Sequence, residues 1–187
     1  MMPCGISLKA KEDVQAMRSP CVLIALTMLF ALAGETEAAA ATFPGPQREL
    51  PSPDSVYAVV WWGPDAGSAN HSLLLRTPYT PKTWRVHSFA RFATVSWAPK
   101  DYIFAVTDRP GSNRATTIVL SVKTPRSVDV CAAPQRELGH QWTTAHHRYC
   151  EHVGWTDRGE LLLRLWGRGE SGTFDRQVTI PMHTIRW

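Results

Sequence analysis

The most constraining feature of the chain is the stretch of residues 93–122, in which strand-forming runs alternate with turn-forming residues. Residues 102–107 (YIFAVT) combine aromatic and β-branched side chains, and their unbroken apolar character predicts a strand buried on both faces. Residues 108–113 (DRPGSN) break the pattern with turn formers, and residues 115–122 (ATTIVLSV) resume it. The stretch therefore predicts consecutive antiparallel strands joined by short turns.

Two further stretches repeat this order of strand, loop and returning strand. In the first, the strand-forming residues 56–62 (VYAVVWW) are followed after a loop by a returning strand at residues 72–77 (SLLLRT). In the second, residues 160–166 (ELLLRLW) are followed after a loop by a returning strand at residues 174–181 (FDRQVTIP). The three units recur about every 50 residues, a spacing at which repeat architectures are considered. The pattern predicts one β domain over residues 54–187 that contains three hairpin units.

The central unit carries a resemblance to a known class of repeats. Residues 96–108 (SWAPKDYIFAVTD) contain a tryptophan, a turn with proline and aspartate, an apolar strand and a polar turn. This order resembles the blade signature of β-propellers of the Tol-system and WD-repeat type, and it also resembles blade-like modules of small uncharacterised exported bacterial proteins. A closed propeller needs about four or more blades, so three units fall short of one. We expect an all-β fold of antiparallel hairpins arranged as a twisted sheet, a sandwich or a partial propeller.

Residues 1–41 have the features of a signal peptide. The apolar run of residues 21–34 follows Arg18, and small residues suited to signal peptidase come after it. We expect this segment to form a helix that is cleaved near Ala40 or Ala41, with translation starting at Met17. The run does not end in a cysteine, so no stable membrane anchor is expected after cleavage. The sequence thus predicts a periplasmic or secreted protein.

Three other segments give local predictions. Residues 42–53 (TFPGPQRELPSP) are rich in proline and are expected to form an extended linker. Residues 83–89 (TWRVHSF) alternate as a strand does, which predicts that Trp84 and Val86 point inward. Residues 135–147 contain the one short helix that we expect after the signal peptide, interrupted by a glycine.

Two cysteines, Cys131 and Cys150, lie beyond the predicted signal peptide. In an oxidising compartment two such thiols favour a disulfide, which would attach the segment between them to the sheet. Two buried free thiols are the alternative.

Histidines gather in the same region, which raises the question of a metal site. Imidazole and thiolate groups are good ligands for zinc and copper, but the spacing here matches no closed zinc site. We therefore expect no metal or other cofactor, and a metal-binding envelope protein is kept as an alternative. The residues concerned are His140, His146, His147, Cys150 and His152.

Neither catalysis nor nucleic-acid binding is indicated by a motif. The Gly-x-Ser-x-Gly elbow of many hydrolases is absent, and the glycine-rich loops lack the Gly-Lys-Ser/Thr ending of a phosphate-binding loop. Removing the predicted leader leaves 17 basic and 12 acidic residues, scattered along the chain with no basic run. This distribution does not predict binding to nucleic acid, but a cationic surface attracts anionic envelope polymers.

The eight tryptophans are first expected to pack in the core, and second to provide a platform for sugars or peptides. Adjacent residues of a strand point to opposite faces, so one of Trp61 and Trp62 is expected to be exposed. We expect a non-catalytic binding or structural module of the bacterial envelope that contacts another envelope protein or polymer. A periplasmic hydrolase with catalytic residues in its loops is the alternative. The candidate contact residues are Trp62, Asp108, Arg109, Ser112, Asn113 and Arg168.

Overall fold

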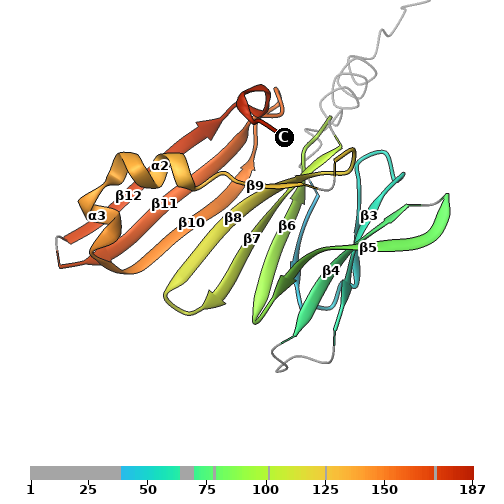
Figure 1. Ribbon diagram of the computed structural model, residues 1–187, viewed down its shortest axis with the longest axis horizontal. Helices are drawn as coiled ribbons and strands as arrows, with labels where there is room; N and C mark the ends of the chain where they lie inside the picture. Colours follow the sequence, from blue (N-terminus) through green and yellow to red (C-terminus); the bar gives the residue numbers. More distant parts are fainter. Residues whose placement is uncertain (1–38, 64–69, 78, 101, 125, 171) are drawn as a thin grey trace, which may run out of the picture. The chain divides into compact units, whose positions relative to one another are not determined.

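The computed structural model describes residues 39–187 except residues 64–69, 78, 101, 125 and 171. These residues form two β-sheets and a few short helices (Figure 1). The prediction of a mostly β fold is confirmed. The predicted signal peptide and its start at Met17 lie outside the described residues except for its last three residues, of which Ala40 and Ala41 belong to a strand.

The larger sheet is mixed. Its neighbours pair antiparallel except β8 and β10, which run parallel, and a short strand, β9 (Ser127–Asp129), pairs with β8 beside the main path. The order across the sheet is β1 (Ala40–Phe43), β6 (Phe92–Trp97), β7 (Ile103–Gly111), β8 (Arg114–Ser121), β10 (Ala145–Trp155), β11 (Leu161–Gly169) and β12 (Gly172–Ile180).

The smaller sheet is antiparallel and follows the order of the sequence. It consists of β2 (Glu49–Pro51), β3 (Ala58–Trp62), β4 (His71–Thr77) and β5 (Thr80–Phe89). The three predicted hairpins are all present, as β3–β4, β6–β7–β8 and β11–β12. They do not form propeller blades, because the second and third hairpins join in one sheet through the parallel pairing of β8 with β10.

One apolar core lies between the two sheets. Large buried side chains come from the smaller sheet and from the β1–β8 part of the larger sheet, and they belong to one cluster. Within it, the ring centroids of Trp97 and Phe104 are 4.8 Å apart. The indole N–H of Trp97 donates a hydrogen bond to the Leu50 carbonyl of β2 at 3.1 Å, which links the two sheets.

A second core lies on the opposite face of the larger sheet. Leu161, Leu163 and Leu165 of β11 are fully buried there, and Trp142 and Met182 belong to the same cluster. The covering elements are α2 (Ala132–Leu138), α3 (His140–Thr143) and the 3₁₀ helix η1 (Met182–Thr184).

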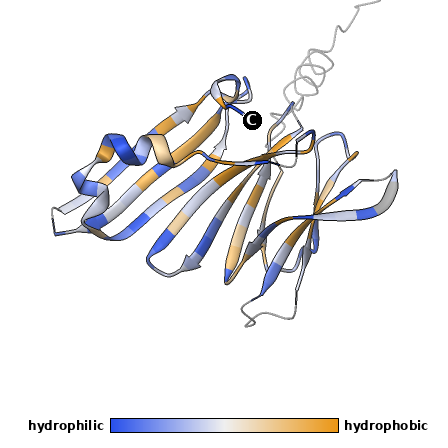
Figure 2. Cartoon of the chain, in the orientation of Figure 1, coloured by the Kyte–Doolittle hydropathy of each residue, from blue (hydrophilic) through white to orange (hydrophobic). Residues whose placement is uncertain are grey.

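The two cores share the central strands. In β7, Phe104 and Val106 belong to the first core and Ala105 to the second. In β8, Leu120 belongs to the first core and Val119 to the second. The predicted burial of β7 on both faces is therefore confirmed. Figure 2 shows apolar and polar residues alternating along the strands. Alternate side chains of the same strands thus belong to two separate cores.

The predicted linker over residues 42–53 is corrected. Phe43 of β1 is fully buried, and Leu50 of β2 is also in the core between the sheets. β1 pairs with β6 and β2 with β3, so the proline-rich segment carries one strand of each sheet.

The expected helix over residues 135–147 is present as two short helices, α2 and α3. Gly139 separates them with a φ of +54°, a conformation that glycine adopts without steric cost. His146 and His147 belong to β10 instead. Within the described residues, the structure contains no helix whose length and apolar character would let it cross a membrane.

Candidate functional site

A candidate site lies on the outer face of β10–β12, the face opposite the helices. Because side chains alternate along a strand, the buried leucines of β11 leave Arg164 and Trp166 on this outer face. The register of β10 and β11 places Tyr149 directly opposite Trp166. Their rings stack with centroids 4.0 Å apart and planes inclined by 16°, and both side chains are partly exposed.

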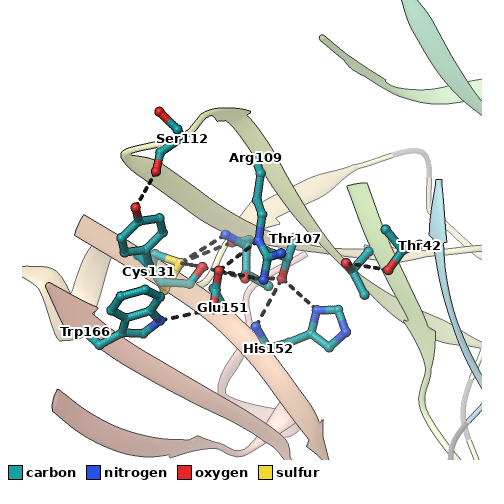
Figure 3. A network of polar contacts seen from close by, with 12 residues as sticks. Thr42, Thr107, Arg109, Ser112, Cys131, Glu151, His152 and Trp166 are labelled. Atoms are coloured by element: carbon teal, nitrogen blue, oxygen red, sulfur yellow. Dashed lines mark hydrogen bonds and ion pairs between the residues drawn. A yellow bond between two sulfur atoms is a disulfide. The ribbon is translucent and has the colours of Figure 1, made fainter. Parts of the chain in front are cut away.

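Glu151 fixes the aromatic pair from one side (Figure 3). One carboxylate oxygen accepts a hydrogen bond from Nε of Arg109 at 2.9 Å and lies 2.8 Å from its Nη2 in an ion pair, and the other oxygen accepts a hydrogen bond from the Trp166 indole N–H at 3.1 Å. The Glu151 side chain is only 13% exposed, so its charge is paired rather than solvated. The carboxylate, itself held by Arg109, thus orients the indole of Trp166.

The neighbouring strand adds a second ion pair. Arg164 of β11 donates two hydrogen bonds to the carboxylate of Asp175 on β12. These bonds from Arg164 lower the pKa of Asp175, and the same carboxylate raises the pKa of Arg164. Both side chains are exposed, so the ion pair orients the side chains of Arg164 and Asp175 but adds little to the free energy of unfolding.

A recess of about 550 Å³ opens beside the stacked rings, and we call it the aromatic recess. Its lining combines the aromatic surface of Tyr149 and Trp166 with the polar side chains of Arg168 and Asp175. The described residues show no ion pair for Arg168, which is exposed. The full lining is His147, Tyr149, Trp166, Gly167, Arg168, Thr173, Phe174 and Asp175.

The structure brings some of the predicted contact residues to this site. Arg168 lines the recess and Arg109 holds Glu151. The Ser112 carbonyl accepts a hydrogen bond from the Tyr149 hydroxyl (Figure 3), and the Asn113 carbonyl accepts one from the backbone N–H of Arg148. Ser112 and Asn113 thus connect the β7–β8 turn to β10 through their backbone.

Two predicted contact residues lie elsewhere. Asp108 forms a hydrogen bond with His87 of β5, with Oδ2 and Nε2 2.9 Å apart, and so links the two sheets. Trp62 is 64% exposed, as expected for one member of the Trp61–Trp62 pair, but it belongs to the smaller sheet. Neither residue lines the aromatic recess.

No sequence motif marks Tyr149, Glu151, Trp166 or Asp175 as site residues. The alternation in residues 160–166 (ELLLRLW) does place Arg164 and Trp166 on one face, which is a usable signal. Whether these side chains lie next to Tyr149 depends on the register of β10 against β11. That register shifts at two places in β10, which the alternation of apolar and polar residues does not reveal.

The histidine cluster does not form a metal site in the described part of the chain, where no group of three or more His, Cys, Asp or Glu side chains converges. Cys150 is bonded to Cys131 in the predicted disulfide, so its thiolate is not free to bind a metal. His146 lies near Glu170 on the surface, whereas His152 contacts Thr107.

His87 and Asp108 form a histidine–carboxylate pair of the kind that belongs to hydrolytic triads. Among the described residues, no serine, threonine or cysteine side chain forms a hydrogen bond with His87. The pair therefore lacks a nucleophile, and it is better explained as a polar link between β5 and β7.

His152 gives a testable pH dependence. Its ring Nδ1 lies 2.7 Å from the Thr107 hydroxyl, and burial together with the positive charge of Arg109 lowers its pKa from 6.5 to about 4. Between these values the unfolded chain binds a proton that the folded chain does not, so stability falls as pH decreases. We expect a loss of about 3 kcal/mol between pH 7 and pH 4 from this residue.

Urea unfolding of the wild type and of His152→Asn at both pH values measures this contribution. The wild type should lose more stability on acidification than the variant by about that amount. Equal losses in the two proteins would show that His152 is not the responsible group.

Comparisons with known proteins give no relative from which a function could be carried over. No protein-family model matches the chain, and neither curated proteins nor solved structures give a significant match. The class is therefore defined by the structure alone, as a mostly β protein with a mixed sheet, a smaller antiparallel sheet and one disulfide.

Proposed function

We propose that the protein is a non-catalytic binding module of the cell envelope and that the aromatic recess binds a glycan strand. The observation that carries this proposal is the stacked, partly exposed pair of Tyr149 and Trp166 at the edge of an open recess. The Trp166 indole is held by Glu151, by the stacked Tyr149 ring and by the Arg164 guanidinium, whose Cζ lies 5.7 Å from the indole centroid. The aromatic surface that remains open to the recess is therefore fixed, and a ligand binds to it with little loss of conformational freedom.

The chemistry of the lining favours a sugar over a purely apolar ligand. Flat aromatic surface packs against the C–H faces of a pyranose ring, while polar side chains at the rim bond its hydroxyl groups. Ligand sites commonly combine an apolar lining with a few convergent polar groups. Arg168 and Thr173 supply donors and Asp175 supplies an acceptor around Trp166.

Charge favours an acidic glycan. Arg168 is exposed with no ion pair among the described residues, and the sequence beyond the predicted leader has more basic than acidic residues. A cationic surface attracts anionic polymers, and the attraction weakens as salt screens it. The disulfide also supports an oxidising compartment such as the periplasm or the cell exterior.

Cosedimentation with purified peptidoglycan sacculi tests the proposal, with cellulose as an uncharged polymer. We expect the full chain to bind sacculi more tightly than cellulose, and Arg168→Gln to weaken binding about fivefold at low salt. Arg158→Gln is a matched control, because Arg158 is also exposed but lies in the turn at the other end of β10 and β11. Absence of binding to sacculi, or equal effects of the two substitutions, would contradict the proposal.

A further inference from the structure

The strand β12 is the last strand of the larger sheet and has one neighbour, β11 (Figure 1). The two strands pair without a shift in register, from Leu161 opposite Ile180 to Gly169 opposite Gly172. In an antiparallel ladder, alternate residues direct their N–H and C=O groups away from the neighbouring strand. Within the described residues, no other strand and no loop backbone bonds to the groups that β12 directs outward. The edge of β12 is therefore a row of backbone donors and acceptors at the surface.

The other sheet edges are protected against pairing with a further strand, whereas β12 is not. The strands β1, β2 and β9 are four, three and three residues long. β5 has ten residues, but it contains Pro81 and Lys82, and its pairing with β4 shifts register twice. Short strands, proline, lysine and bulges are the features by which natural sheets block edge pairing. β12 has nine residues in regular pairing and contains neither proline nor lysine.

The two charged residues of β12 are already paired within the chain. The Asp175 carboxylate accepts two hydrogen bonds from Arg164, and Arg176 forms an ion pair with Glu137 at 3.4 Å. These charges are neutralised by their partners, so they oppose the approach of another strand less than isolated charges would.

The inner side of β12 carries apolar side chains that the chain covers only in part. Phe174, Val178 and Ile180 pack against the second core but remain partly exposed. A strand that pairs with β12 and carries apolar residues on the same side would remove more of this surface from water, which is favourable. The edge of β12 therefore fits a polypeptide strand.

We propose that this strand is β12 of a second copy of the chain, paired antiparallel about a two-fold axis perpendicular to the sheet. In such a pair, the residue on the axis lies opposite itself. Arg176 on the axis would face a second arginine and Asp175 would face a second aspartate, and like charges directly opposite are destabilising. Gln177 on the axis avoids both, because each amide has a donor and an acceptor for the other.

The register centred on Gln177 matches apolar and polar residues. Phe174 lies opposite Ile180 of the second copy, so two partly buried apolar side chains cover each other. Asp175, which lines the aromatic recess, lies opposite Thr179 of the second copy, whose hydroxyl group supplies a donor beside the recess. Because the axis is perpendicular to the sheet, the outer faces of both copies lie on the same side, and the dimer presents two aromatic recesses there.

Sedimentation velocity of the full chain over about 1–100 μM tests the proposal without any glycan, so its outcome is independent of glycan binding. We expect a monomer–dimer equilibrium with a dissociation constant on the order of 10 μM, since one strand pair makes a small interface. Gln177→Lys and Gln177→Glu each place two like charges on the axis and should weaken the dimer at least tenfold. Thr83→Lys, at an exposed position of β5, is the matched control and should leave the equilibrium unchanged.

A mixture of the Gln177→Lys and Gln177→Glu proteins makes the test specific for this register. It should restore a dimer with one copy of each, because opposite charges then face each other on the axis. Far-ultraviolet circular dichroism shows that the variants are folded. A wild type that stays monomeric would overturn the proposal. Association that Gln177→Lys and Thr83→Lys affect equally, or a mixture that does not dimerise, would place any contact elsewhere and overturn it as well.

Discussion

Replacing Trp97 with alanine is expected to lower the free energy of unfolding by about 3–5 kcal/mol, the usual cost of removing a large aromatic side chain from a core. Trp97 is fully buried, packs against Phe104 and donates a hydrogen bond to the Leu50 carbonyl. Its removal leaves a cavity between the two sheets and an unpaired carbonyl, so packing and hydrogen bonding are lost together.

Urea unfolding followed by far-ultraviolet circular dichroism measures this loss. Trp97→Phe should fall between the wild type and the alanine variant, because it keeps much of the packing but not the indole N–H. Trp62→Ala is a matched control at an exposed tryptophan and should change stability by no more than about 0.5 kcal/mol. If Trp97→Ala and Trp62→Ala had similar effects, the core between the sheets would not be as described.

Removing the disulfide by the double substitution Cys131→Ser and Cys150→Ser is expected to cost about 3 kcal/mol. The two cysteines are 19 residues apart in sequence, and closing a loop of this length restricts the unfolded chain by about that much. Cys131 immediately precedes α2 and Cys150 lies in β10, so the bond also attaches the helices to the sheet over the second core.

The same quantity can be measured by adding a reductant during urea unfolding. Dithiothreitol should destabilise the wild type by a similar amount and leave the double variant unchanged. A wild type whose unfolding midpoint is insensitive to reductant, with free thiols that react before unfolding, would contradict the disulfide.

Much of the strand content could be predicted from the sequence, because alternation and turn residues are local signals. The apolar run around Phe104 correctly indicated a strand with two buried faces, and the pair Trp61–Trp62 correctly indicated one exposed indole. The disulfide followed from the presence of just two cysteines beyond the leader.

The assembly of the strands into sheets could not be predicted in the same way. The parallel contact of β8 with β10 joins segments that are separated by the two short helices, and no local pattern specifies it. Phe43 lies among prolines and looks like linker sequence, yet it is buried because β1 pairs with β6. Trp84 and Val86 are both predicted to point inward; Val86 packs against the core, but Trp84, although it pairs with buried Leu75, has a side chain that is 50% exposed.

In the candidate site, too, some residues could be predicted from the sequence and others could not. Arg109 and Arg168 were predicted as contact residues from their places in or beside turns, and both are at the aromatic recess or support it. Asp108 was predicted with them but points to His87 between the sheets, since neighbouring residues of a strand face opposite ways. The stack of Tyr149 on Trp166 requires two strands in register, which only the structure provides.

The proposal that the outer face of β10–β12 is the binding surface is tested most directly at the Trp166 indole N–H. In ¹⁵N-labelled protein this proton gives its own nuclear magnetic resonance signal, and its bond to Glu151 makes the signal sensitive to a ligand in the recess. On titration with soluble glycan fragments released from sacculi, we expect the Trp166 signal to shift and that of exposed Trp62 to remain in place. A shift of Trp62 with Trp166 unchanged would contradict the account.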